Sequence, residues 1–132
     1  MGKLAEAARG RPSRRTVYVL GVEPRELADP GDGGALAATT TCFVALVSAH
    51  ASPGETRTLG DPLFVGQELD LIFETDGGDC VVTADSAVNQ TGNNTLTFAD
   101  AGDHLRLIGA RDGAGAYEWR VVANDGVGLT TV

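Results

Sequence analysis

The sequence predicts an all-β protein: an antiparallel β-sandwich, jelly roll or small barrel of about seven or eight strands, preceded by an extended N-terminal arm. Apolar and polar residues alternate over several short segments, which is typical of half-buried strands. Turn sequences rich in Gly, Asp and Asn recur about every 8–12 residues, and the 18 glycines exceed the usual share. No segment has the helical period of a crossover between parallel strands, so we expect short turns to join antiparallel neighbours.

Charge divides the chain into a basic arm, residues 1–16, and a single β-domain, residues 17–132. The arm has five cations and one acid, so its net charge is +4. Since the whole chain has a net charge of −8, the domain carries −12. The arm cations are Lys3, Arg9, Arg11, Arg14 and Arg15. An acidic body repels nucleic acid, whereas a basic arm can attract an acidic surface. No apolar run reaches the roughly 18–20 residues of a membrane span, and the N-terminus lacks a signal-peptide core, so neither a membrane nor a nucleic acid is expected as a partner.

The first part of the domain is expected to alternate between strands and loops. Residues 16–22 (TVYVLGV) are rich in β-formers and should pair with the body. Residues 23–36 are interrupted by Pro and Gly and predict a loop, with one helical turn conceivable at residues 24–28. Residues 50–60 are polar and contain a Pro-Gly turn signal, so they also predict a loop or hairpin tip.

Residues 39–48 (TTTCFVALVS) predict a strand that is apolar on both faces. One face carries Cys42, Val44 and Leu46, and the other carries Phe43, Ala45 and Val47. A strand of this kind is either central in a sheet or covered by a partner subunit. We therefore assign the second face as a candidate subunit interface.

Residues 66–124 hold the clearest strand pattern in the chain. Within residues 67–75, Leu69, Leu71 and Phe73 alternate with polar residues, which predicts one buried and one wet face. Further strands are expected at residues 80–84, 95–99, 104–110, 116–123 and 127–131. Trp119 alternates with charged residues in the segment 116–123 and is expected to fill the core.

Catalytic chemistry is not indicated. The two histidines, His50 and His104, have no nucleophile motif nearby, so a Ser-His-Asp site is not expected. Paired carboxylates at residues 76–79 and 100–103 could serve glycoside hydrolysis across a cleft, but their spacing is that of tight turns. The sequence therefore predicts that the chain is not an enzyme.

Cofactor and metal binding are not indicated either. No segment has the spacing of an EF-hand loop or of a phosphate-binding loop that opens a helix. Cys42 and Cys80 lack metal-ligand spacing and are expected to be small buried hydrophobes. A bridge between them would require their Cα atoms to lie within about 7 Å.

Three segments together resemble a module common in virion proteins of tailed bacteriophages. They are GQELDLIFETDGGDCVVTA, GNNTLTFADAGDHLRL and GAYEWRVVANDGVGL, within residues 65–84, 92–107 and 115–129. The shared features are an Asp-Gly-Gly-Asp turn, a Thr-x-Thr-Phe strand, an Asp-x-Gly-Asp turn and a closing strand that contains Trp. The resemblance implies a β-rich capsid decoration (cement) protein, head fibre, or tail-fibre or spike segment, commonly homotrimeric, and it implies no catalytic residues.

Among these roles the chain is expected to be a decoration protein, because it has neither the heptads nor the fixed repeat of a fibre shaft. It would be made in the host cytoplasm and bind the outer capsid surface of the virion as a homotrimer. The arm cations are the expected contact with the major capsid protein, and Phe43, Ala45 and Val47 the expected contact between subunits.

Two alternatives stay open at this point. The first is a head- or tail-fibre knob that binds a host receptor or carbohydrate, with Trp119, Tyr117 and the amides of residues 89–94 as its surface. The second is a component of a phage depolymerase.

Overall fold

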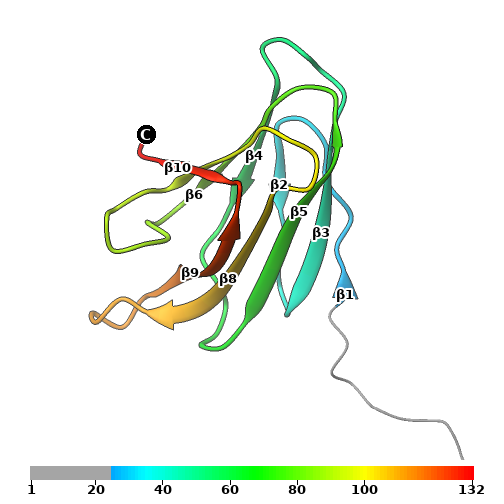
Figure 1. Ribbon diagram of the computed structural model, residues 1–132. Helices are drawn as coiled ribbons and strands as arrows, with labels where there is room; N and C mark the ends of the chain where they lie inside the picture. The colour runs from blue at the N-terminus through cyan, green and yellow to red at the C-terminus, as the bar shows by residue number, and fades with distance from the viewer. Residues whose placement is uncertain (1–24) are drawn as a thin grey trace, which may run out of the picture.

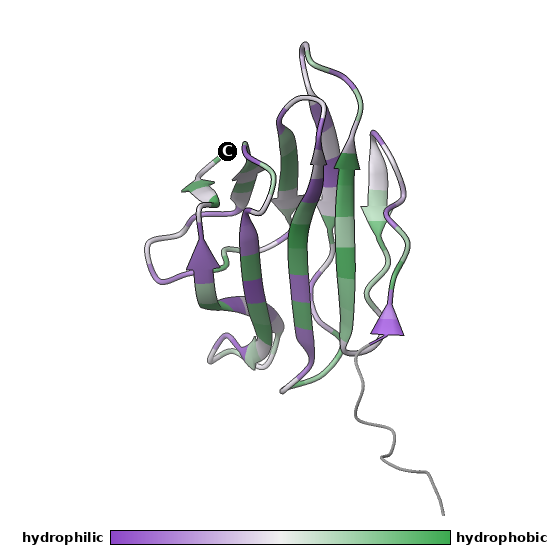
Figure 2. Ribbon diagram, turned by 45° about the vertical axis from the view of Figure 1, so that its right-hand side comes forward, coloured by the Kyte–Doolittle hydropathy of each residue, from purple (hydrophilic) through white to green (hydrophobic). Residues whose placement is uncertain are grey.

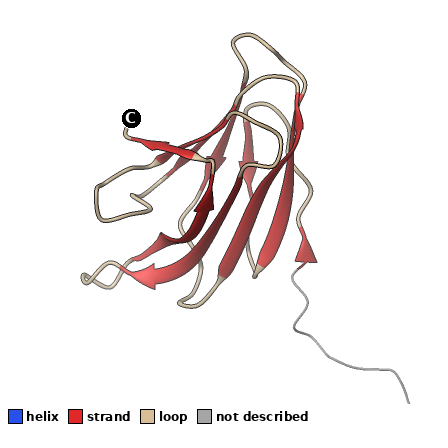
Figure 3. Ribbon diagram, viewed as in Figure 1, coloured by secondary structure: helices blue, strands red, loops and turns tan. Residues whose placement is uncertain are grey.

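The computed structural model describes residues 25–132, which form ten strands and no helix (Figure 3). The strands are β1 (Arg25–Glu26), β2 (Gly34–Leu36), β3 (Cys42–Ser48), β4 (Glu55–Leu59), β5 (Glu68–Asp76), β6 (Cys80–Ala84), β7 (Thr95–Phe98), β8 (His104–Arg111), β9 (Tyr117–Asp125) and β10 (Gly128–Thr130). Within these residues there is accordingly no helix of the length and hydrophobicity needed to cross a membrane. The predicted basic arm and the predicted strand at residues 16–22 lie outside the described residues.

The strands form two five-stranded sheets that pack face to face (Figure 1). Sheet A has the order β1-β3-β5-β8-β9, and sheet B has the order β10-β7-β6-β4-β2. One hydrophobic core lies between them, with side chains such as Leu71 and Trp119 from sheet A and Val82 and Phe98 from sheet B. The all-β prediction is confirmed, and the architecture is an open two-layer sandwich rather than a closed barrel.

Both sheets are mixed, so the expectation of antiparallel sheets is wrong. In sheet A, β1, β3 and β5 are parallel, and in sheet B, β2, β4 and β6 are parallel. The chain alternates between the two sheets over these six strands, so neighbours within a sheet are two strands apart in sequence and run the same way. Only the pairings that involve β7 to β10 are antiparallel. The prediction failed because a short turn can also join strands in opposite layers.

The Asp-Gly-Gly-Asp turn is one of these connections between layers. It leads from β5 in sheet A to β6 in sheet B and packs against the chain that follows β3. The N–H of Gly77 donates to the carbonyl oxygen of Ser48 at 2.8 Å. A Cβ on Gly77 would collide with that oxygen, and one on Gly78 would collide with the carbonyl oxygen of His50. The two glycines therefore permit successive turns to stack in direct backbone contact.

Three strands lie where the sequence predicted loops. The first two, β1 and β2, lie within residues 23–36, and β1 is found where a helical turn was conceivable at residues 24–28. The third, β4, lies within residues 50–60 and has the polar sequence ETRTL. Its inward residues include Glu55 and Arg57, both buried, which is why hydrophobic patterning did not reveal it.

The β3 strand is flanked on both sides, by β1 and β5, and one of its faces is fully buried. Cys42, Val44 and Leu46 face the core. On the opposite face Phe43 and Ala45 are half-buried, and Val47 is 42% exposed. The burial expected for both faces is therefore found on one. Figure 2 shows β3 as hydrophobic over most of its length, whereas β5 beside it alternates.

The predictions for Trp119 and for the two cysteines are confirmed. Trp119 is 1% exposed, and its Nε1–H donates to the carbonyl oxygen of Gly60 at 2.9 Å. Cys42 in sheet A and Cys80 in sheet B are buried free thiols. All three side chains belong to the core.

Candidate partner-binding surface

The outer face of sheet A carries the predicted subunit-contact residues. We define this outer face by eight side chains that alternate with core residues along three adjacent strands: Phe43, Ala45, Val47, Asp70, Ile72, His104, Arg106 and Ile108. We call Phe43, Ala45 and Val47 on β3 the apolar stripe. Phe43 is paired with Asp70 and Ala45 with Ile72, so the apolar stripe adjoins a row of one charged and one apolar residue on β5. The structure thus places Phe43, Ala45 and Val47 on one face, as the sequence predicted.

A hydrogen-bonded charge cluster lies at the centre of the outer face. Asp70 is 8% exposed and is paired with Arg106 on β8. Arg106 donates to its carboxylate from Nε at 3.0 Å and from Nη2 at 3.1 Å, and His104 Nε2 lies 2.9 Å from Oδ1. Burial raises the pKa of Asp70, but the hydrogen bonds from Arg106 and His104 outweigh that effect and hold it below its usual value. The carboxylate is therefore ionised and already satisfied within the chain.

The exposed end of the apolar stripe is fixed from beneath by a second ion cluster, which the sequence did not reveal. Because β1 pairs only with the first two residues of β3, the backbone of Val47 has no strand partner on that side. Its N–H donates to Asp29 Oδ2 at 2.9 Å, and its carbonyl oxygen accepts from Arg57 Nη2 at 3.0 Å. Two side chains thus take the place of a neighbouring strand and hold Val47 in position.

Arg57 is the centre of this second cluster, and its side chain is fully buried. Nε and Nη2 donate to Asp29 at 2.7 and 2.9 Å, and Nη2 also donates to Glu55 Oε1 at 2.9 Å. Glu55 Oε2 in turn accepts the N–H groups of Ala49 and His50 at 2.6 and 3.2 Å. The cluster therefore joins β4 to the chain on both sides of β3. The burial of ETRTL does alternate, as is typical of a strand. One of its inward positions, however, is occupied by the cation Arg57, which hydrophobic patterning does not recognise.

The charges of this cluster are stabilised in their ionised forms. The hydrogen bond to Asp29 is the main cause of the raised pKa of Arg57. Burial raises the pKa of Asp29, but hydrogen bonds from Arg57 and from backbone N–H groups outweigh it and hold this pKa below its usual value. The pKa of Glu55 is also lowered, chiefly by the N–H of Ala49. The arrangement is a structural clamp whose members all have partners.

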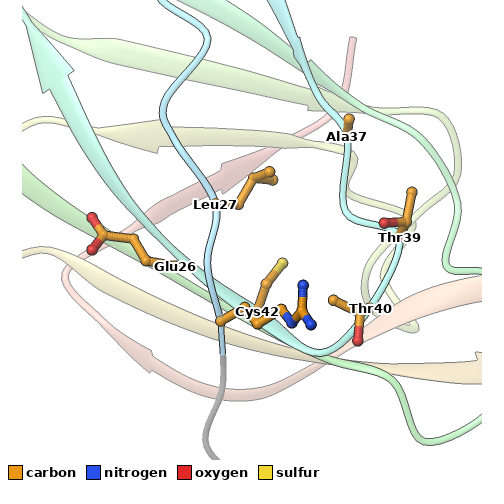
Figure 4. Close-up of a pocket in the computed structure, with 7 residues that line it drawn as sticks. Glu26, Leu27, Ala37, Thr39, Thr40 and Cys42 are labelled. Atoms are coloured by element: carbon orange, nitrogen blue, oxygen red, sulfur yellow. The ribbon is translucent and has the colours of Figure 1, made fainter.

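One small pocket lies beside β1 (Figure 4). Its volume is about 160 Å³, and its walls include Leu27, Thr40 and Cys42. Pockets that enclose small organic ligands are usually about 300–1,000 Å³, so this one has room for a side chain or two. Among residues 25–132, no group of three or more His, Cys, Asp or Glu side chains is arranged to hold a metal ion.

Trp119, Asn89 and Asn94, which belong to the surface considered for a carbohydrate-binding knob, are engaged internally. Trp119 is buried and cannot offer a face for stacking. Asn89 Oδ1 accepts the N–H groups of Gly92 and Asn93 at 3.0 Å each, and Asn94 Nδ2 donates to Ala84. Asn89 thus shapes its own loop, and Asn94 fastens that loop to β6.

The outer face of sheet A thus combines an apolar stripe with central charges that already have partners within the chain. The predicted arm contacts, Lys3, Arg9, Arg11, Arg14 and Arg15, lie outside the described residues. No protein-family model, no curated protein and no solved structure matches this chain.

Proposed function

We propose that the chain is a capsid decoration (cement) protein of a tailed bacteriophage. It binds the outer surface of the assembled major-capsid shell as a homotrimer and stabilises that shell. The observation that carries the proposal is the apolar stripe of Phe43, Ala45 and Val47, presented on a rigid strand at the outer face of sheet A. The resemblance of three segments to phage virion modules supports the assignment to a virion.

The outer face suits a permanent contact between subunits. Each square ångström of apolar surface removed from water contributes about 25 cal/mol. Covering a charged group without a partner would oppose this gain, but Asp70 already has hydrogen bonds from Arg106 and His104. A second copy can therefore cover the stripe and the charge cluster without leaving an unpaired carboxylate.

The stabilising mechanism follows from mass action. A subunit that binds the assembled shell and not the separate capsid proteins lowers the free energy of the assembled state. The cations of the arm attract carboxylates on the shell, and a trimer presents three arms at once. Binding of the second and third arms is then effectively intramolecular. The activity needs no cofactor, nucleic acid or membrane.

Replacing Val47 with Glu tests the subunit interface. We expect Val47→Glu to convert the trimer to a monomer in sedimentation velocity, because three buried carboxylates would meet without partners. Val122→Glu is the matched control, since Val122 is 56% exposed and lies on β9, and it should remain trimeric. If Val47→Glu is folded by circular dichroism and still trimeric, the outer face of sheet A is not the subunit contact.

Deleting residues 1–15 tests the role of the arm. The truncated protein should keep its β-sheet circular dichroism and lose binding to capsids. Charge reversal at Arg14 and Arg15 should weaken binding more at low salt than at high salt, because exposed charges are screened over about 10 Å at 0.1 M salt. A truncated protein that saturates capsids like the full chain would show that the arm is not the tether.

A further inference from the structure

A rigid loop between β4 and β5 exposes three consecutive large apolar side chains. Leu63, Phe64 and Val65 are 57%, 43% and 46% exposed, respectively. We refer to these three residues as the apolar loop. Single exposed hydrophobic residues are ordinary on protein surfaces, whereas contiguous exposed apolar surface is typical of contact sites.

The apolar loop is held in place by a buried glutamine. The side chain of Gln67 is fully buried, and its Oε1 accepts the N–H of Leu63 at 2.7 Å. Its Nε2 donates to the carbonyl oxygens of Ala38 and Thr40 at 2.9 and 3.0 Å, in the connection from β2 to β3. One amide therefore fastens the loop to a neighbouring connection at the same end of the sandwich.

The backbone of β8 supports the loop from the other side. Gly66 donates to the carbonyl oxygen of Gly109 at 2.9 Å, and Gly109 donates to that of Gln67 at 2.7 Å. A Cβ on Gly109 would lie 2.5 Å from the carbonyl oxygen of Phe64, so the close contact requires glycine there. A loop fixed in this way loses little conformational entropy when a partner binds it.

The apolar loop lies at the end of the sandwich where the described chain begins (Figure 1). Arg25 is paired with Cys42, and Cys42 with Leu69, so the starts of β1, β3 and β5 are level. β1 and β5 are two strands apart, about 10 Å. The 24 residues that precede Arg25 contain all five cations of the predicted arm. The described part of the chain therefore begins beside the apolar loop.

The two ends of the sandwich differ in charge. The end opposite the apolar loop carries exposed carboxylates and, among the described residues, no exposed Arg or Lys. Those carboxylates belong to Asp32, Asp76, Asp79, Asp100 and Asp125. The end with the apolar loop also has acids, but it carries the exposed cations Arg25 and Arg111. An acidic partner is therefore repelled less by this end than by the opposite one.

We propose that this end of the domain faces the shell, with the apolar loop as its anchor in an apolar depression bordered by carboxylates of the capsid protein. This inference rests on the proposed decoration function and names the docking surface. A buried apolar anchor supplies affinity, while a charged border mainly governs the rate and orientation of association.

The test uses shells of the major capsid protein from the phage that encodes this chain, freed of decoration protein. Binding is measured by co-sedimentation over a range of protein concentrations. Replacing all three loop residues with Ser should weaken binding at least about 100-fold, since a few central apolar anchors dominate the affinity of an interface. Val122→Ser, which removes an equally exposed apolar side chain on β9, should bind within about twofold of the unchanged protein.

A single-residue variant and the unchanged protein separate the possible outcomes. The single variant Phe64→Asp should show the same loss of binding with an unchanged melting temperature, which guards against misfolding of the triple variant. If the folded loop variants bind shells like the unchanged protein, the docking surface is wrong and the decoration function stands. If the unchanged protein does not bind shells, the decoration function fails and this inference fails with it. If the loop variants lose their trimeric state, the loop is a subunit contact and the proposal is overturned.

Discussion

Replacing Arg57 with Met tests the buried ion cluster that holds Val47. The guanidinium donates five hydrogen bonds: two to Asp29, one to Glu55 and two to main-chain carbonyl oxygens. Met conserves much of the volume but leaves two carboxylates without their cation. Removing one partner of a buried ion cluster costs about 3–5 kcal/mol, out of a typical total of about 5–15 kcal/mol for a domain. We therefore expect Arg57→Met to lose about a fifth or more of the stability.

The free energy of unfolding is measured by urea titration, followed by the fluorescence of Trp119, the single Trp of the chain. A loss of about 3–5 kcal/mol corresponds to a melting temperature lower by roughly 10–20 °C for a domain of this size. Arg106→Met is the comparison variant, because the side chain of Arg106 is 46% exposed and Asp70 keeps its contact with His104 when Arg106 is removed. Its loss of stability should therefore be smaller than that of Arg57→Met.

The pH dependence gives an independent check of the same cluster. The pKa of Asp29 is lower in the folded chain than in the unfolded one, so its contribution is present above the unfolded value of about 3.9 and is lost as pH falls through the folded value. The difference in stability between the unchanged protein and Arg57→Met should therefore shrink from pH 7 to pH 3. A variant that loses less than about 1 kcal/mol at pH 7, or no more than Arg106→Met, would refute the reasoning.

Two further predictions concern the core and the turns. Gly77→Ala should lower the free energy of unfolding by about 1–3 kcal/mol, because the new methyl group meets backbone atoms of Ser48. Gly60→Ala, whose methyl group meets only a side-chain oxygen at 3.8 Å, should be neutral or slightly stabilising in the same urea titration. Equal effects of the two substitutions would contradict the stacking of turns. Burial raises the pKa of the Cys42 thiol and that of the Cys80 thiol, the latter to about 11. Both thiols should therefore react with a disulfide reagent at pH 8 far more slowly in the native protein than in urea. Equal rates would show that the thiols are accessible in the native protein.

Periodicity revealed the strands whose inward residues are apolar. The alternation of Leu69, Leu71 and Phe73 identified β5 and its buried face, and the burial of Trp119 followed from the same rule. β4 was missed because Arg57 occupies an inward position, and its partner Asp29 lies 28 residues away. Such pairing has no signature in a single sequence, since each residue read separately looks like a solvated charge.

Strand direction could not be derived from turn length. The Asp-Gly-Gly-Asp turn has the length of a hairpin connection, yet it crosses between layers, and the alternation between sheets makes β1 to β6 parallel within each sheet. The candidate surface was predicted better: Phe43, Ala45 and Val47 share one outer face because strand geometry requires it. The apolar loop was not predicted, because its anchoring by Gln67 depends on contacts with distant residues.

The most direct test of the decoration function is the number of copies bound to the shell. Purified protein is added to shells freed of decoration protein, unbound protein is removed, and the ratio of this chain to the major capsid protein is measured at saturation. The decoration function predicts saturation at three copies for each local threefold axis of the shell. No binding, or only a few copies at a single vertex, would contradict it.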